Sequence, residues 1–151
     1  MKKRTMARIP DLGLEWKVIL EIKLKKHTHF GDIGGNLFSI LEVMPGFVNV
    51  NVKVHLTSTS LGLVHEVIRD QIRSFHSIDC SMVPKVGKWT RIEVSQQEED
   101  GRHFLALSVE GNESGREEIS GPDLFYFSHT WIDSCTEGAL CGDVRRLVVL
   151  N

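Results

Sequence analysis

Long apolar runs and an excess of charge of one sign are both missing from this chain of 151 residues. A transmembrane helix needs roughly 20 consecutive apolar residues, and the apolar runs here, such as Leu147 to Leu150, are far shorter. The formal net charge is only -2, so the chain as a whole does not attract nucleic acid or an anionic membrane. We therefore expect no membrane span and no nucleic-acid partner.

A signal peptide is also missing: the amino terminus, "MKKRTMARIP", is basic but lacks an apolar segment of about 7–15 residues. Either the protein is cytosolic, or it is secreted and its signal peptide has been removed. The basic residues of this terminus fit a solvated end of the chain better than a phosphate-binding arm. We predict that residues 1–10 form a disordered basic tail and that residues 11–151 form a single domain.

Cysteine is scarce, with three residues: Cys80, Cys135 and Cys141. No CxxC or HxxxH pairing is present, so a zinc site is not expected. Cys135 and Cys141 close a short loop, which suits a disulfide in an oxidising compartment or two free thiols in a reducing one. Cys80 is then a small buried side chain, an intermolecular bridge, or the partner of a cysteine outside this chain.

The sequence does contain alternation of apolar and polar residues with a period of two, which is typical of half-buried strands. In "FVNVNVKVHL" one face collects five aliphatic residues, Val48, Val50, Val52, Val54 and Leu56. In "EWKVILEIKLKK" the inward set is Trp16, Val18, Leu20, Ile22 and Leu24. Ile19 interrupts the otherwise polar face of this second strand.

Eight further segments are strand candidates: 36–43, 61–70, 71–78, 88–96, 103–110, 116–120, 124–131 and 143–151. The segment 60–75 also fits helical spacing, and we predict strands there. Turns rich in Gly, Pro, Asn and Asp recur at intervals of about 8–12 residues, as sandwiches require. The sequence therefore predicts an all-β fold, an antiparallel two-sheet β-sandwich of the jelly-roll kind.

The best-defined hairpin runs from Gly87 to Gly111, "GKWTRIEVSQQEEDGRHFLALSVEG". Its first strand has an apolar face of Thr90, Ile92 and Val94, and its second has one of Leu105, Leu107 and Val109. The linking "QQEEDG" is too acidic to be buried, and its glycine can adopt positive φ. We predict two core-lining strands joined by a solvated acidic turn.

Segments of this region resemble the laminin-G-like and legume-lectin-like (concanavalin A-like) jelly-roll superfamily. The resemblance rests on "GKWTRIEVSQ", "LSVEGN", "REEIS" and the closing "LFYFSHTWIDSCTEGALCGDVRRLVVL", and covers mainly residues 83–150. The hairpin is also similar to that of uncharacterised secreted animal proteins. The resemblance implies the sandwich fold and leaves the function open, because such folds carry many activities.

Two departures from neighbouring families bear on function. Galectins carry an H-x-N-x-R element and a later W-G-x-E-x-R; here "VHLTSTS" around His55 lacks the Asn and Arg, and Trp89 is followed by Thr90. The closely spaced E-x-D-x-x-E of glucanases is also absent from the sequence. A β-galactoside site and a glucanase site are therefore not predicted.

The preferred binding site is the segment "HTWIDSCTEG", with Trp131, Asp133 and Glu137 as candidate ligand-binding residues. An indole face packs on sugar rings, and carboxylates accept hydroxyl hydrogen bonds or coordinate Ca2+. The alternative is a Trp131 that caps the core. We expect a secreted recognition domain that binds a glycan or a protein through edge loops, with no cofactor unless Ca2+ is bound.

The histidines support a second hypothesis, an enzyme that acts on a small organic substrate in a cavity of the sandwich. His55, His103 and His129 are its acid/base candidates, and the alternative for each is a hydrogen-bonded strand residue. No G-x-S-x-G elbow or phosphate-binding glycine loop accompanies them.

A metal site and two further roles complete the hypotheses. His27, His29 and Asp32 could share a metal ion, although a polar strand end explains the first two more simply. Asn112 begins an N-x-S sequon, a glycosylation signal that favours secretion. The third functional hypothesis is a structural or assembly module whose exposed sheet face pairs with another chain, which would make the protein an oligomer.

Overall fold

The chain is described from a computed structural model. The structure describes the backbone of residues 4–11, 15–24, 35–43, 48–56, 61–69, 71–80, 82, 84–119, 126–134 and 142–150. It describes side-chain surroundings within residues 15–24, 52, 54–55, 61–65, 71–72, 77–80, 82, 84–119, 143 and 145–150.

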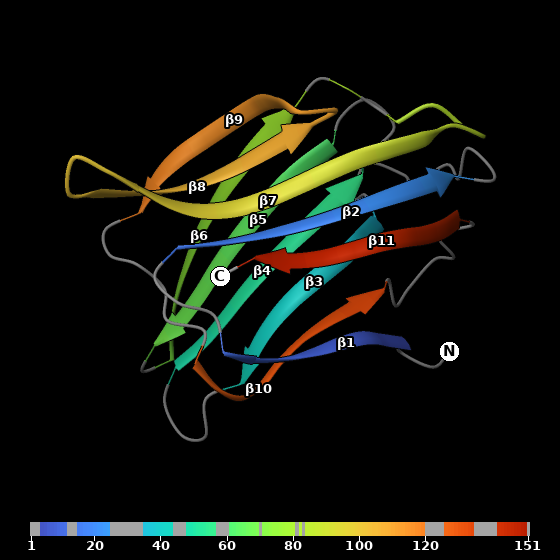
Figure 1. Cartoon of the computed structure of the whole chain (residues 1–151). Helices are drawn as coiled ribbons and strands as arrows, with labels where there is room; N and C mark the ends of the chain where they lie inside the picture. The colour runs from blue at the N-terminus through green and yellow to red at the C-terminus, as the bar shows by residue number, and fades with distance from the viewer. Residues whose placement is uncertain are drawn as a thin grey trace.

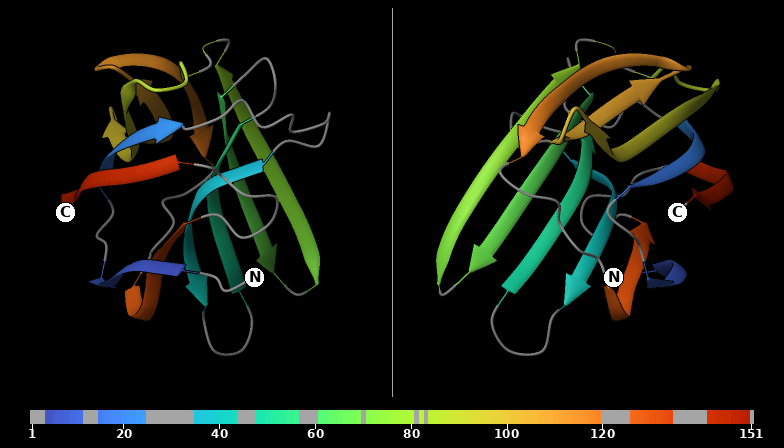
Figure 2. Two further views of the ribbon diagram at one scale, coloured as in Figure 1. Left: turned by 90° about the vertical axis from the view of Figure 1, so that its right-hand side faces the viewer. Right: turned by 60° about the vertical axis from the view of Figure 1, so that its left-hand side comes forward.

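Two antiparallel sheets face each other, as Figures 1 and 2 show. One sheet has six strands in the order β1 (Arg4–Asp11), β10 (Tyr126–Ser134), β3 (Gly35–Val43), β4 (Val48–Leu56), β5 (Leu61–Arg69) and β6 (Ile72–Cys80). The other has five in the order β11 (Gly142–Leu150), β2 (Trp16–Leu24), β7 (Trp89–Glu99), β8 (Arg102–Val109) and β9 (Asn112–Ile119). The predicted all-β sandwich is confirmed, and residues 60–75 contribute strands rather than a helix.

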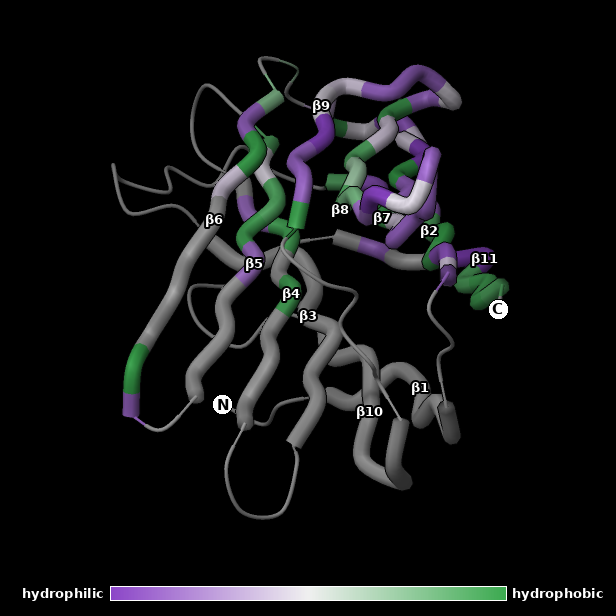
Figure 3. Tube along the Cα trace, turned by 90° about the vertical axis from the view of Figure 1, so that its left-hand side faces the viewer, coloured by the Kyte–Doolittle hydropathy of each residue, from purple (hydrophilic) through white to green (hydrophobic). Residues whose placement is uncertain are grey.

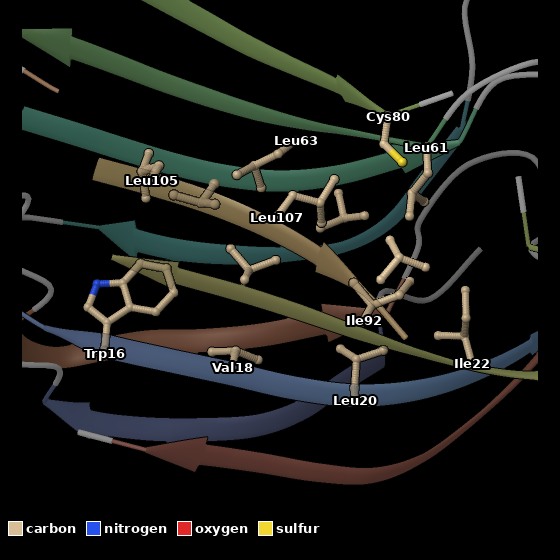
Figure 4. Close-up of a cluster of buried hydrophobic side chains, with 14 of the residues drawn as sticks. Trp16, Val18, Leu20, Ile22, Leu61, Leu63, Cys80, Ile92, Leu105 and Leu107 are labelled. Atoms are coloured by element: carbon tan, nitrogen blue, oxygen red, sulfur yellow. The ribbon is translucent and has the colours of Figure 1, made fainter. Parts of the chain in front are cut away.

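The space between the sheets is filled by the residues that the alternation predicts. Every second residue of β2 is buried, because only one face of the strand turns toward the other sheet. Side chains from both sheets meet in this core, among them Trp16, Leu20, Leu63, Ile92 and Leu107 (Figure 4). Removing each such side chain from water stabilises the fold by roughly 1.5–3 kcal/mol. Cys80 is a buried free thiol in this same core.

The predicted hairpin forms, with a longer first strand and a tighter turn than the sequence indicates. β7 continues to Glu99, so most of "QQEEDG" is strand and only Asp100 and Gly101 form the turn. Their φ values of 51° and 75° are both positive, as a two-residue type I′ turn requires. The strand that follows this hairpin, β9, is largely hydrophilic, as Figure 3 shows.

The amino-terminal segment differs from the predicted tail. Arg4–Asp11 forms β1, an edge strand that pairs with β10, so residues 1–10 are not simply a disordered extension. Cross-strand backbone hydrogen bonds hold such a segment without any apolar alternation in its sequence, which is why composition indicates a tail.

Within the described residues, no helix is long and apolar enough to cross a membrane.

The free edges of the two sheets close together at β6 and β9. Gly115 of β9 lies so near Ile78 of β6 that a β-carbon on it would stand 2.5 Å from Ile78 Cγ2. A glycine is therefore needed for this close approach of the strands.

Candidate functional site

The structure brings several of the candidate residues into the six-stranded sheet. Trp131, Asp133 and His129 belong to β10, and His55 belongs to β4. Six further candidates lie outside the described residues: His27, His29, Asp32, Cys135, Glu137 and Cys141.

Strand register aligns these positions in rows across the sheet. Val52, Val54, Leu61 and Leu63 are buried against the other sheet, so the residues that alternate with them belong to the outer face. The first outer row contains Trp131, Leu41, Asn51, Glu66 and Phe75. The second contains Asp133, Ser39, Lys53, Val64 and Ser77. The third contains Asn36, His55, Gly62 and Asp79.

The third row contains a histidine, a glycine and an aspartate in direct contact, which we call the His55 cluster (His55, Gly62 and Asp79). The Nε2 atom of His55 lies 3.9 Å from Oδ1 of Asp79, with β5 between their two strands. Gly62 makes this approach geometrically feasible, because a β-carbon there would stand 2.3 Å from His55 Cε1 and 2.9 Å from Asp79 Oδ1. The imidazole therefore lies directly over the glycine.

The cluster is open to solvent on the side of Asp79. The Asp79 side chain is 65% exposed, whereas that of His55 is 19% exposed and so is largely covered by its surroundings. Ser77, in the neighbouring row, is exposed as well. An imidazole, a carboxylate and a hydroxyl together supply both donors and acceptors, so this end of the face can hydrogen-bond a hydroxyl-rich ligand.

Two of the histidines proposed for catalysis, His55 and His103, are not brought together. His103 lies in β8 of the five-stranded sheet, where it pairs with Glu98 and Ile119, while His55 lies in the other sheet. His65 is buried on the inner face of β5, opposite to the face of His55. The enzyme hypothesis thus loses the pair His55 and His103 as a shared acid/base centre.

Other sequence candidates are placed as follows. Asn112, the sequon residue, is exposed at the first position of β9. Trp89 lies in β7, in the other sheet from His55, so the two do not form one site. Among the residues whose side chains are described, no three His, Cys, Asp or Glu residues are grouped as metal ligands.

Sequence reasoning missed Gly62 and Asp79. Asp79 is 24 positions from His55, and only the pairing of β4, β5 and β6 brings the two together. A signal for Gly62 was present, because a lone glycine inside a strand pattern such as "LGLVHEV" indicates close approach of another group.

Comparison with known proteins extends only to the fold. The sequence matches no family model and no curated protein. Among solved structures, the botulinum neurotoxin serotype D binding domain is similar, with a TM-score of 0.63 and 12% identity over 94% of this chain. The alignment covers 33% of that chain, so this protein spans about a third of its length.

Two smaller proteins are similar over most of their own length. Sheep galectin-11, solved as a complex with glycerol, gives a TM-score of 0.53 and 10% identity, covering 99% of this chain and 95% of its own. The CBM40 of a Ruminococcus gnavus IT-sialidase, bound to alpha2,3 sialyllactose, gives 0.51 and 10%, covering 88% of this chain and 78% of its own. These likenesses establish a jelly-roll β-sandwich fold.

Proposed function

We propose that this protein is a recognition domain that binds a glycan on the outer face of its six-stranded sheet. The observation that carries the proposal is the His55 cluster, in which a partly buried imidazole and an exposed carboxylate meet over a glycine. Hydrogen bonds from sugar hydroxyls to a carboxylate are charge-assisted and therefore stronger than neutral ones. The partly buried imidazole has less freedom than an exposed side chain, which lowers the entropic cost of ordering it on binding.

The sequence candidates Trp131 and Asp133 extend the same proposed site. Asp133 is one row and two strands away from His55. With strands about 4.8 Å apart and a rise of about 3.3 Å per residue, the two positions are separated by roughly 12 Å. A ligand that reached both positions would have more than one sugar ring. We assign Trp131 the role of an aromatic platform for a ring, and Glu137, which follows β10 in sequence, the role of an additional acceptor.

The similar solved structures support a binding role of this kind. The CBM40 structure contains sialyllactose, and the botulinum structure is of a binding domain, so the fold accommodates recognition in both. A protein ligand on the same face is the alternative partner. We further propose that the protein acts outside the cell, since the sequon residue Asn112 is exposed.

The proposal is tested by screening the wild-type protein on a glycan array and measuring each positive glycan by calorimetry. His55→Ala and Asp79→Asn should each weaken binding by about tenfold or more, since the first removes the imidazole and the second removes the charge that strengthens a hydrogen bond to position 79. His103→Ala is the matched control, because it removes a partly buried histidine from the other sheet. Unchanged affinity in both cluster variants would exclude the His55 cluster as the binding site. A failure to bind any glycan would favour a protein ligand.

A further inference from the structure

The outer face of the five-stranded sheet contains a second unusual arrangement, centred on two consecutive arginines of β11. In a regular strand, neighbouring side chains point to opposite faces. A β-bulge between Arg145 and Val148 interrupts this alternation. Within the bulge, Arg146 has a φ of 53°, which residues with a β-carbon rarely adopt. Both arginines consequently reach the same carboxylate: Arg145 Nε lies 2.5 Å and Arg146 Nη1 lies 3.2 Å from Glu21 oxygens.

Trp89 orients the first of these arginines. The guanidinium of Arg145 lies 3.9 Å from the centroid of the Trp89 ring, and Lys23 Nζ lies 5.8 Å from the same centroid. Stacking fixes the plane of the guanidinium but leaves its edge open. The hydrogen bond to Glu21 uses Nε of Arg145, which leaves the two Nη groups of the fork unused by that carboxylate.

The surroundings of Trp89 are basic, and we call them the Trp89 patch. A hydrogen bond from Gly87 N to Leu24 O, 2.7 Å long, holds the segment before β7 against the end of β2. Its cations are the residues placed beside Trp89 or Glu21 by contact or by strand register: Lys23, Arg91, Arg145 and Arg146. The carboxylates in contact with these residues are Glu21, Glu93 and Glu110, so positive charge predominates.

The opposite corner of the same sheet face is acidic. There Arg102 and Arg116 stack on the ring of Phe104, at 5.5 Å and 5.1 Å from its centroid. Three carboxylates pair with them, those of Glu99, Glu113 and Glu118, so negative charge exceeds positive charge at this corner. A long polyanion that crossed the whole face would be repelled at this corner, so the Trp89 patch suits a short anionic ligand.

We propose that the Trp89 patch binds sulfate groups of an acidic oligosaccharide, independently of the glycan site on the other sheet. A guanidinium held against an aromatic ring can bind a tetrahedral oxyanion through two parallel N–H donors. Arg146 and Lys23 contribute further positive charge beside it, and the bulge places Arg146 on the face where it can do so. Glu21 keeps the arginines in position while neutralising only one of their two charges.

Calorimetry with a heparin-derived oligosaccharide at about 50 mM salt tests the proposal, because electrostatic binding is strongest at low ionic strength. The wild type should bind, and Arg145→Gln combined with Arg146→Gln should weaken binding by about tenfold or more. Arg102→Gln is the matched control: it too removes an exposed arginine stacked on an aromatic ring and paired with a glutamate. His55→Ala should leave heparin binding intact, which separates this site from the proposed glycan face.

Three results would overturn the proposal: no binding of heparin by the wild type, an equal loss in Arg102→Gln, or equal affinity for a short DNA duplex. Circular dichroism and thermal unfolding establish that each variant is folded. Arg145→Lys provides a second measurement that does not depend on the double variant, since it keeps the charge and removes the fork. It should bind heparin several-fold more weakly than the wild type, and undiminished affinity would exclude recognition through the fork.

Discussion

The imidazole of His55 occupies the space that a side chain at position 62 would need, with Cε1 only 2.3 Å from where a β-carbon of residue 62 would lie. Gly62→Ala should therefore displace His55 from Asp79 without removing any polar group. We expect ligand affinity to fall by an amount similar to that for His55→Ala. Calorimetry with the best array glycan, together with thermal unfolding, measures this effect. A Gly62→Ala protein that is folded and binds normally would show that the geometry of the His55 cluster is unimportant for recognition.

Gly115 should be equally intolerant of a side chain, but for stability rather than for binding. An alanine would overlap Ile78 at the closed edge between β9 and β6, and such overpacking costs about 1–3 kcal/mol. Chemical denaturation of Gly115→Ala measures the loss of unfolding free energy. In the double variant with Ile78→Ala the overlap disappears, so the combined cost should be smaller than the sum of the two single costs. Simple additivity would contradict the contact.

Acid should destabilise the protein through three glutamates that are paired with arginines. Hydrogen bonds from arginines, foremost Arg145, Arg116 and Arg102, hold the pKa values of Glu21, Glu113 and Glu118 below the ordinary value of 4.5. Because the folded-state pKa values are depressed, the stability these pairs contribute is present above the unfolded value and is lost as pH falls through the folded ones.

The melting temperature followed from neutral pH to below pH 4.5 tests this expectation. Glu118→Gln and Arg102→Gln should each reduce the decline by a similar amount, since each removes the same pair. The double variant should behave like either single one, and a decline as steep as in the wild type in all three would contradict the assignment. The effect should be modest because these pairs are exposed.

The core between the sheets should respond to truncation according to burial. Ile92 has 0% exposure, so Ile92→Ala should lower the unfolding free energy by about 2–5 kcal/mol through lost burial and a residual cavity. Ile72 is 73% exposed, and Ile72→Ala should change it by about 0.5 kcal/mol or less. Urea denaturation of the two variants measures the contrast, and equal effects would be inconsistent with the packing.

The exposed sequon should carry a glycan when the protein is made in a secretory pathway. Asn112 is accessible at the beginning of β9, beside the tight turn at Glu110 and Gly111. We expect removal of N-linked glycans by an amidase to increase electrophoretic mobility, and Asn112→Gln to abolish the difference. Secreted wild-type protein that shows no such shift would exclude modification at this residue.

Much of the fold was predictable from local pattern. The strict alternation in β2 and the apolar faces of β7 and β8 required no knowledge of partners, because a half-buried strand must place every second residue in the core. β1 was not predictable in this way, since its pairing with β10 depends on backbone hydrogen bonds that no residue pattern encodes. The extent of the turn after β7 was also unclear from composition, because acidic residues suit an exposed strand end as well as a loop.

The candidate site was predictable only in part. His55 is recognisable as a polar residue on a strand face, but its contact with Asp79 requires three strands in one register. The same holds for Arg145 and Arg146, whose shared contact with Glu21 depends on a bulge and on a partner far away in the chain. The sequence by itself determined the two-layer β architecture, since burial and strand periodicity are local properties. Tertiary structure alone decided which polar groups meet, because register is set by the packing of all strands together.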